Sequence, residues 1–394
     1  MPLKSLLMIP GPTPVPEDVL RAVARPMINH RGPEYTAMQR ELVAGLKSAF
    51  QTQGDVQIFP ASGTGGLEAA LVNVLSPGDR VLAAPIGSFG DRFADIAAAC
   101  GADVRRLVIP WGEAAEPEAV VRALQEAPTA RALLLTHNET STGVLNDIQA
   151  LAAAARGVRP DLLILVDGIS GMLAADLQPD AWDLDVVVGG SQKAWMIPPG
   201  LTFVSISARA WEAHRTARMS RYYFDFARMR KAMEADQTPY TPALPQLFGL
   251  QVALRRIQEE GLPAGFARHA RMGHAARAAA AALDLELFAR ERPSPALTAL
   301  RAPKGISGRT LRVHLRDHYG VEVAGGQGAV KDAIFRIGHL GYVSEHDLLA
   351  TVGALERTLR DLGRPVELGA GLRAAQQALA GPLPGIPAPR DGDA

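Results

Sequence analysis

Short apolar runs separated by helix-like stretches recur through the first half of the chain, and this pattern constrains the fold most. Candidate strands lie at residues 56–59, 80–83, 104–108, 132–135, 162–166, 186–188 and 201–206. Between several of them, residues 67–75, 91–100 and 117–126 have helical spacing and composition. Strands that alternate with helices form a mostly parallel sheet covered by helices. The sequence therefore predicts an α/β sheet domain whose fully apolar strands are buried on both faces.

The pattern changes after about residue 255. The alanine-rich residues 264–285 predict a long helix, followed by candidate strands near 311–315 and 334–337 and a helix over 344–362. We interpret this part of the chain as a smaller α+β domain. The predicted organisation is an N-terminal arm (1–21), a large domain (22–255), a small C-terminal domain (256–380) and a proline-rich tail (381–394) that we expect to be disordered.

Charge and cysteine content exclude several classes of partner. The 394 residues include 41 basic and 41 acidic side chains, so we expect no nucleic-acid and no membrane partner. The one cysteine, Cys100, excludes an intrachain disulfide, an iron–sulfur cluster and a multi-thiolate zinc site, and no metal is expected. The apolar patch at residues 6–9 is short and is followed by four prolines, unlike a signal peptide or a membrane span. We expect a cytoplasmic protein.

The most informative motif is Gly-Gly-Ser-Gln-Lys at residues 189–193, directly after a candidate strand. A lysine just past the carboxyl end of a buried strand lies where α/β folds bind ligands. Burial there lowers the pKa of the ammonium and frees the amine of Lys193 to form a Schiff base. An ordinary surface lysine after a turn would have the same local sequence.

Two further strand ends carry polar side chains. Asp167 directly follows the run 162–166, where a carboxylate could pair with a pyridinium nitrogen, although a turn or helix-capping aspartate is also common there. The loop His-Asn-Glu-Thr-Ser-Thr-Gly at 137–143 follows another strand and could bind a hydroxylated ring or cap a helix. Asp167 and Lys193 are separated by one strand–helix–strand step.

The glycine-rich segment 61–66 lies between a strand and the helix that begins near Leu67. Backbone N–H groups at a helix N-terminus can bind a phosphate, although a purely structural turn would look similar. The third glycine of a dinucleotide fingerprint would fall at Glu68, and no Gly-Lys-Ser/Thr follows, so the segment is neither a nicotinamide-dinucleotide motif nor a P-loop.

Phosphate-binding turn, polar loop, strand-end aspartate and strand-end lysine follow one another in the order of fold-type-I pyridoxal-phosphate enzymes. The sequence resembles the class V aminotransferases, especially the alanine–glyoxylate and serine–pyruvate or serine–glyoxylate branch. The resemblance runs from Ile-Pro-Gly-Pro-Thr at 9–13 to about Leu355. Its most specific stretches are residues 67–75, 140–144, 191–193 with Pro199-Gly200, and 336–338.

This resemblance implies pyridoxal 5'-phosphate as cofactor, with Lys193 as its Schiff-base lysine and Asp167 on the pyridine nitrogen. It assigns Arg336 to the substrate α-carboxylate. Further positions that it assigns to the cofactor are Ser62, Gly63, Thr64 and Gln192 (phosphate), Thr140 (ring hydroxyl side), Phe89 (ring stacking, where the family often has tryptophan), and Tyr240 with Thr241 (phosphate of a second subunit). The last pair implies a homodimer.

The expected function is transfer of an amino group from alanine or serine to glyoxylate or pyruvate by a ping-pong mechanism. Aspartate or ureidoglycine donors, or a lyase or cysteine desulfurase of the same fold, are the alternatives. A desulfurase needs a reactive loop cysteine, whereas Cys100 closes a predicted helix. A subunit of a redox complex is a non-enzymatic alternative. Arg31, in the loop 29–32, is the one candidate for binding a second substrate carboxylate.

Overall fold

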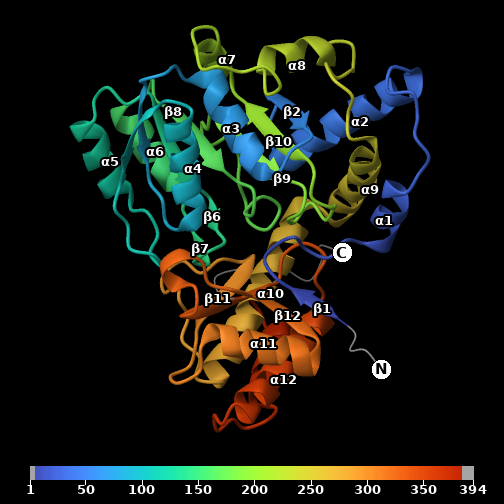
Figure 1. The fold of residues 1–394 in the computed structure, drawn as a ribbon, viewed down its shortest axis with the longest axis vertical. Coiled ribbons are helices and arrows are strands. Elements are labelled where there is room, and N and C mark those ends of the chain that lie inside the picture. Colours follow the sequence, from blue (N-terminus) through green and yellow to red (C-terminus); the bar gives the residue numbers. More distant parts are fainter. Residues whose placement is uncertain (1–4, 384–394) are drawn as a thin grey trace.

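The computed structural model describes residues 5–383, and its largest element is a seven-stranded sheet in the order β2-β10-β9-β8-β5-β3-β4 (Figure 1). Strands β4, β3, β5, β8 and β9 are parallel to one another, whereas β10 is antiparallel to both β9 and β2. The predicted α/β class and mostly parallel sheet are confirmed. The strand bounds are β2 Asp55–Phe59, β3 Arg80–Ala83, β4 Asp103–Arg106, β5 Ala132–Thr136, β8 Leu163–Asp167, β9 Val186–Gly190 and β10 Thr202–Ile206.

Helices cover both faces of this large sheet because alternate residues of its apolar strands point to opposite sides. Leu133 and Ile164 belong to a core cluster that also includes residues of α1, α2, α5, α6 and α9, whereas Leu134 and Leu165 pack with α3, α4, α7 and α8. The helix bounds are α1 Glu17–Val23, α2 Pro33–Phe50, α3 Gly63–Val74, α4 Ser88–Ala99, α5 Pro117–Glu126, α6 Ile148–Val158, α7 Ala208–His214, α8 Phe226–Met233 and α9 Leu244–Glu260.

Helix α3 begins four residues earlier than its apolar pattern predicts. Gly63 and Gly66 lie within its first turns and not in a preceding turn. A Cβ at Gly63 would lie 2.5 Å from Ile169, and one at Gly66 would lie 2.1 Å from Thr202. These glycines therefore let the start of α3 approach the strand ends closely.

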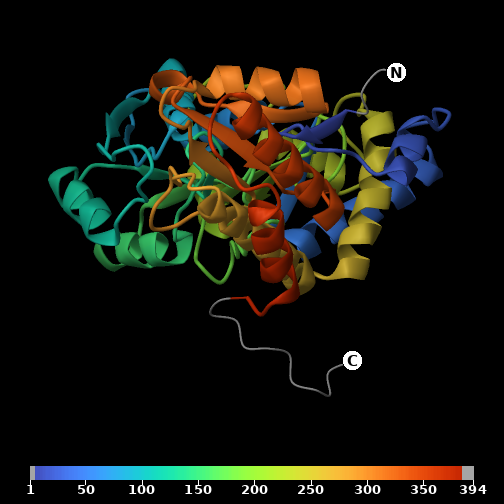
Figure 2. The same ribbon diagram turned by 90° about the horizontal axis from the view of Figure 1, so that it is seen from below.

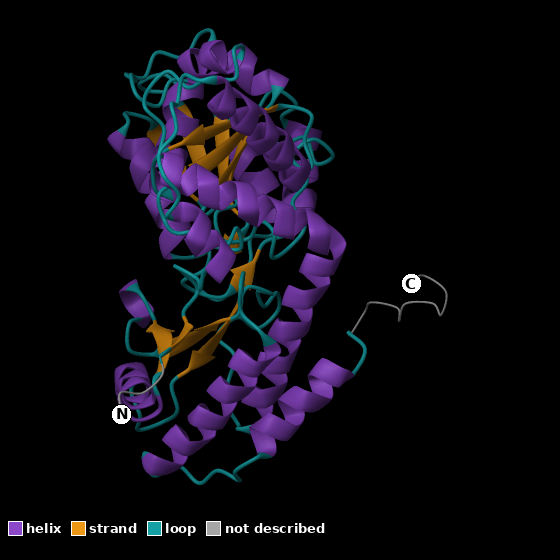
Figure 3. Ribbon diagram, turned by 90° about the vertical axis from the view of Figure 1, so that its right-hand side faces the viewer, coloured by secondary structure: helices purple, strands orange, loops and turns teal. Residues whose placement is uncertain are grey.

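The second sheet has four strands in the order β1-β12-β13-β11, and Figure 3 shows it as a separate group of strands below the large sheet. Strand β1 (Leu6–Met8) pairs in parallel with β12 (Val321–Gly325), so the N-terminal strand lies in a sheet otherwise formed late in the sequence. The orange and red helices of the C-terminal part of the chain face the viewer when the molecule is seen from below (Figure 2). The remaining bounds are β11 Leu297–Arg301, β13 Ile334–Gly338, α10 Leu262–Ala282, α11 Gly308–Tyr319, α12 Glu345–Asp361 and α13 Ala370–Ala380, with a two-stranded pair β6 Asn138–Glu139 and β7 Val144–Leu145 and a short 3₁₀ turn at Gly328–Val330.

The predicted strand at 311–315 is wrong, because these residues lie in the middle of helix α11. Leu311, Val313 and Leu315 alternate as in a strand, but only Leu311 and Leu315 are buried, with Val313 37% exposed. The helix is marked instead by its ends: Ser307 caps the N-terminus and Gly320 ends it in the left-handed conformation.

The last helix, α13, was also absent from the sequence-based prediction. Of the predicted tail, residues 384–394 lie outside the described residues. Within residues 5–383, no helix combines the length and the hydropathy that a membrane crossing requires.

Candidate active site

Lys193 lies three residues after β9, and its side chain is buried, with 9% of the residue exposed. Its Nζ donates a hydrogen bond of 2.9 Å to the carbonyl oxygen of Pro10. Burial lowers the pKa of this ammonium to about 8, although the carboxylate of Asp167 acts in the opposite direction. At neutral pH about one tenth of such a group is a free amine, which makes Lys193 a plausible nucleophile.

Asp167 is the last residue of β8, the strand next to β9. Burial raises the pKa of its carboxyl to about 7, against the hydrogen bond from the Ile169 N–H and the charge of Lys193, which lower it. The Oδ1–N distance of that hydrogen bond is 3.0 Å. A cationic N–H placed opposite this carboxyl would favour its ionised form.

The N-terminus of α3 supplies an anion-binding surface. Ser62 is the N-cap residue, and its side chain makes no capping hydrogen bond. The first N–H groups of a helix have no partner within the helix, and Gly63 and Thr64, the first two residues of α3, both line the cavity. Beside them, the buried side-chain oxygens of Gln192 and Asn138 have no hydrogen-bond partner within the described part of the chain.

A hydrogen-bonded group of polar side chains forms the next wall. The Oγ1 of Thr140 donates to the Oγ of Ser170 at 3.2 Å. Ser170 donates in turn to the carbonyl oxygen of Asn138 at 2.8 Å. The Nδ2 of Asn138 donates to Ser170 at 2.9 Å, so the orientations of the three side chains depend on one another.

Phe89 lies in the first turn of α4 and is held there by a buried carboxylate. The Oε2 of Glu139 accepts hydrogen bonds from the N–H groups of Phe89 and Gly90 at 3.1 and 3.0 Å. One turn further along α4, the guanidinium carbon of Arg92 lies 4.8 Å from the centre of the Phe89 ring. Arg92 makes no ion pair with the residues that the structure describes, and its charge acts on both Asp167 and Lys193.

These groups surround one cavity of about 200 Å³. It is lined by Ser62, Gly63, Thr64, Leu67, Phe89, Arg92, Asn138, Thr140, Asp167, Ile169, Ser170, Gln192 and Lys193. The structure thus brings together eight of the residues singled out from the sequence. Sequence reasoning missed Arg92, Ile169 and Ser170, although the last two follow Asp167 within three positions. Residues 5–383 contain no group of three or more His, Cys, Asp or Glu side chains arranged to hold a metal ion.

Arg336 lies on β13 of the small sheet and does not line this cavity. Only 5% of the residue is exposed, and burial lowers the pKa of its guanidinium to about 10. Its Nη1 donates to the carbonyl oxygen of Thr140 at 2.5 Å, and its Nε to that of Gly325 at 2.7 Å. Arg336 therefore contacts the backbone of a residue that does line the cavity.

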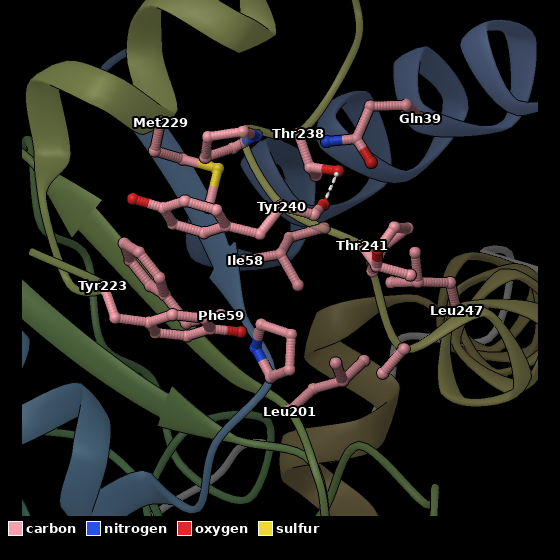
Figure 4. A pocket seen from close by; sticks show the side chains of 14 residues that line it. Gln39, Ile58, Phe59, Leu201, Tyr223, Met229, Thr238, Tyr240, Thr241 and Leu247 are labelled. Atoms are coloured by element: carbon pink, nitrogen blue, oxygen red, sulfur yellow. Dashed lines mark hydrogen bonds between the residues drawn. The ribbon is translucent and has the colours of Figure 1, made fainter. Parts of the chain in front are cut away.

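Tyr240 and Thr241 lie outside the cavity within their own chain. They line a second, largely apolar pocket with Tyr223, Thr238 and Leu247 (Figure 4). Tyr240 stacks on Tyr223, with ring centres 5.1 Å apart, and donates from its hydroxyl to the carbonyl oxygen of Tyr222 at 3.0 Å.

Arg31, the candidate for a second substrate carboxylate, is directed elsewhere. Its Nη1 donates to the carbonyl oxygen of Thr238 at 2.5 Å and to the Oε1 of Gln237 at 3.3 Å. Arg31 therefore fixes the segment that precedes Tyr240, and it is absent from the cavity lining.

Comparison with known proteins identifies the family. Residues 8–344 match the family model described as aminotransferase class-V. The chain is a class V aminotransferase. It is therefore a transaminase by family, and the predicted resemblance is confirmed.

Individual relatives of this class V aminotransferase carry different names. It is 44% identical to the soluble hydrogenase, small subunit, of Synechococcus sp. over 95% of this chain and 98% of that one. It is 40% identical to the L-aspartate–glyoxylate aminotransferase of Paracoccus denitrificans, over 94% and 95% of the two chains. It is 37% identical to the serine–glyoxylate aminotransferase of Methylorubrum extorquens, over 96% of each.

Solved structures share the fold over nearly the whole length. The ureidoglycine–glyoxylate aminotransferase of Bacillus subtilis superposes with a TM-score of 0.90, at 29% identity over 96% of this chain and 98% of that chain. A desulfurase chemistry is not favoured for the aminotransferase described here. Cys100 caps the C-terminus of α4 away from the cavity, and burial raises the pKa of its thiol, which disfavours a reactive thiolate.

Proposed function

We propose that this transaminase uses pyridoxal 5'-phosphate to move an amino group from a small amino acid, alanine or serine, to glyoxylate or pyruvate. The observation that carries the proposal is the convergence of a buried lysine, a buried carboxyl and a helix N-terminus on one cavity. An amine, a partner for a pyridine nitrogen and a phosphate-binding surface are the three groups that this cofactor needs.

The residues present fit the cofactor in their chemistry. Lys193 would bind its aldehyde carbon, Asp167 its ring nitrogen, and Ser62, Gly63 and Thr64 its phosphate. The unpartnered oxygen of Gln192 and that of Asn138 are buried in the same cavity, where each would gain a hydrogen-bond donor from a bound ligand or water. When bound, pyridoxal phosphate supplies an aldehyde for the substrate amine and an electron-withdrawing ring.

The chain's own residues would then control one proton. Lys193, with its amine free, would act first as a general base that removes the proton from the substrate Cα. It would then act as a general acid that gives the proton to a second carbon atom. Its pKa of about 8 is close to the operating pH, as a proton-transferring group requires. Asp167 would keep a proton on the ring nitrogen by supplying the negative charge opposite it.

Arg336 supports a substrate with one carboxylate. Its guanidinium is buried beside the carbonyl of Thr140, and a guanidinium binds a carboxylate through paired hydrogen bonds. Arg31 contacts the segment at residues 237–238 and does not line the cavity of its own chain, so we do not assign it a second carboxylate site. Two relatives are named for glyoxylate, with serine in one case and aspartate in the other. Arg92 is the other cation at the cavity and is the residue to test against a dicarboxylate donor.

The hydrogenase-subunit name of one relative suggests a redox role as the rival function. A cluster bound by several thiolates needs several cysteines, and this sequence has one. The cavity instead gathers groups suited to transamination, and no side chain around it requires a redox partner to explain its position.

We also propose a homodimer in which Tyr240 and Thr241 of each chain reach the phosphate site of the other. The two residues are half-buried and exposed, respectively, at a pocket separate from the cavity of their own chain. Tyr222, beside them, is 65% exposed, and an exposed aromatic cluster of this kind is typical of a protein–protein interface.

The function is tested by adding pyridoxal 5'-phosphate to the purified protein and recording its visible absorption before and after borohydride reduction. We expect a band that disappears and a cofactor fixed to the peptide that contains Lys193.

A grid of amino donors against glyoxylate, pyruvate and 2-oxoglutarate then identifies the substrates. Arg92→Gln and Arg31→Gln are matched variants within it. An aspartate preference that only Arg92→Gln removes would refute the small-donor proposal but leave the transaminase intact.

A further inference from the structure

A backbone turn near the N-terminus contacts the reactive end of Lys193. The Nζ of Lys193 lies 2.9 Å from the carbonyl oxygen of Pro10 and donates a hydrogen bond to it. The next residue, Gly11, has a φ of +139°. A Cβ at Gly11 would lie 2.4 Å from Nζ and 2.8 Å from both Cδ and Cε of the lysine. The lysine side chain therefore occupies the space that a side chain at residue 11 would fill.

The same turn is fixed on both sides. The N–H of Thr13 donates to the carbonyl oxygen of Gln192 at 3.1 Å, and its Oγ1 donates to that of Lys193 at 3.0 Å. On the other side, Gly338 packs so closely that a Cβ there would lie 2.3 Å from the carbonyl of Ile9. Gly338 lies two residues after Arg336 on β13. The turn thus contacts both Lys193 and β13, the strand that carries Arg336.

We propose that the Pro10–Gly11 turn is a docking point that holds the side chain of Lys193 whenever its amine is not joined to the cofactor. The Pro10 carbonyl accepts the hydrogen bond, and the absent side chain of Gly11 provides the space. Pro10 and Gly11 are positioning residues that act through Lys193. The proposal rests on the proposed function, because that reaction releases the lysine amine in every turnover.

The docking point matters because the released amine has to transfer a proton at one defined carbon atom. An unrestrained lysine side chain samples many rotamers, and each alternative removes the amine from the substrate. A fixed acceptor 2.9 Å away restricts that motion without a permanent bond. Alanine at residue 11 displaces the flexible end of the lysine and leaves the surrounding backbone in place, apart from the strain of a non-glycine residue at positive φ.

Gly11→Ala is therefore the informative variant, and Gly305→Ala is its matched control. Gly305 also has a positive φ, +84° against +139° at Gly11, but no atom lies within 4 Å of a Cβ built there, so it controls for alanine at positive φ without a steric contact. We expect Gly11→Ala to retain the cofactor but to lower kcat on the order of tenfold, the loss that removal of one positioning hydrogen bond produces. Gly305→Ala should retain wild-type kcat.

A second measurement needs no cofactor. Reductive methylation of Lys193 in the apo-protein, quantified by peptide mass spectrometry across pH, reports the fraction of free amine. Because the Pro10 carbonyl stabilises the ammonium, Gly11→Ala should shift this profile to lower pH, while Gly305→Ala should not. The charged groups that act on Lys193, namely Asp167, Glu139, Arg336 and Arg92, are the same in all three proteins. An unchanged profile would overturn the docking point even if the enzyme is a transaminase.

Amine rescue separates docking from general damage. Lys193→Ala should recover partial activity with added methylamine, and Gly11→Ala in that background should leave the rescued rate unchanged because no tethered lysine remains to be held. An equal loss in the rescued enzyme would show that residue 11 acts through the fold, which overturns the proposal. If the wild type forms no visible complex with pyridoxal phosphate, the proposed function fails, and the methylation profile alone decides on the docking point.

Discussion

Replacing Asp167 with asparagine should change stability and activity in opposite directions. The carboxyl is 5% exposed, and burial raises its pKa from 3.8 to about 7. That rise corresponds to about 4 kcal/mol of extra free energy for the ionised form in the fold. Asparagine is uncharged and of the same shape, and its oxygen can still accept the hydrogen bond from the Ile169 N–H.

The pH dependence of this effect has a defined sign. Because the pKa is higher in the folded than in the unfolded chain, Asp167 stabilises the fold progressively less as pH rises from about 4 to about 7. In the apo-protein, Asp167→Asn should therefore match the wild type at the acid end. It should exceed the wild type by on the order of 1–4 kcal/mol at pH 8. Urea unfolding of both proteins at pH 4, 6 and 8 measures the difference.

In the enzyme loaded with cofactor, the same substitution removes the negative charge opposite the ring nitrogen. Loss of one partner from a buried ion pair weakens the interaction by about 3–5 kcal/mol, so kcat should fall on the order of 10²-fold to 10⁴-fold. A variant with wild-type kcat would refute the pyridine-binding role. An apo-variant less stable than the wild type at pH 8 would show that Lys193 already stabilises the carboxylate, contrary to the buried-charge reasoning.

Further substitutions and measurements test the remaining assignments. Lys193→Ala should abolish turnover and borohydride-fixed cofactor while leaving the far-ultraviolet circular dichroism unchanged, and residual covalent cofactor would identify another lysine. Arg336→Ala should lower kcat/KM for every amino donor by a factor on the order of 30 or more, from a loss of about 2–5 kcal/mol, whereas Arg31→Ala should leave alanine turnover largely unchanged. Multi-angle light scattering should give the mass of two chains at assay concentration, and an active monomer would exclude a shared site. Tyr240→Phe should then raise the dissociation constant for pyridoxal phosphate but not for pyridoxal, and an equal change in both would place the tyrosine away from the phosphate.

The large sheet was predictable from sequence because its strands are buried on both faces. Such strands appear as continuous apolar runs, and the runs at 80–83 and 132–135 differ from the observed β3 and β5 by at most one residue. The small sheet was harder to predict because alternation of apolar residues has two explanations. In α11 the spacing of Leu311 and Leu315 serves a helix face as well as a strand face, and only Ser307 and Gly320 at its ends distinguish the two.

The residues of the candidate site were likewise predictable only where the local sequence carries a signal. Lys193 and Asp167 were found because each follows a recognisable strand, and parallel strands bring their carboxyl ends to one edge of the sheet. Arg92 contributes to the cavity from one turn inside α4, and no local signal distinguishes it from the other arginines of surface helices.

Arg31 and Arg336 show most clearly what the sequence alone could not decide. Both are arginines near a glycine. The family resemblance assigned Arg336 to the substrate α-carboxylate, and Arg31 was the candidate for a second carboxylate. Both guanidinium groups donate only to neutral carbonyl or amide oxygens, so the structure separates them by burial and by position. Arg31 binds the segment before Tyr240 at an exposed site, whereas Arg336 is buried and is bonded to the carbonyl of Thr140. A buried guanidinium satisfied only by neutral carbonyls retains its full charge for an incoming carboxylate. Arg336 therefore remains our proposed carboxylate ligand. Its position on β13, two residues before the glycine that packs on the Pro10–Gly11 turn, would connect carboxylate recognition to the positioning of Lys193.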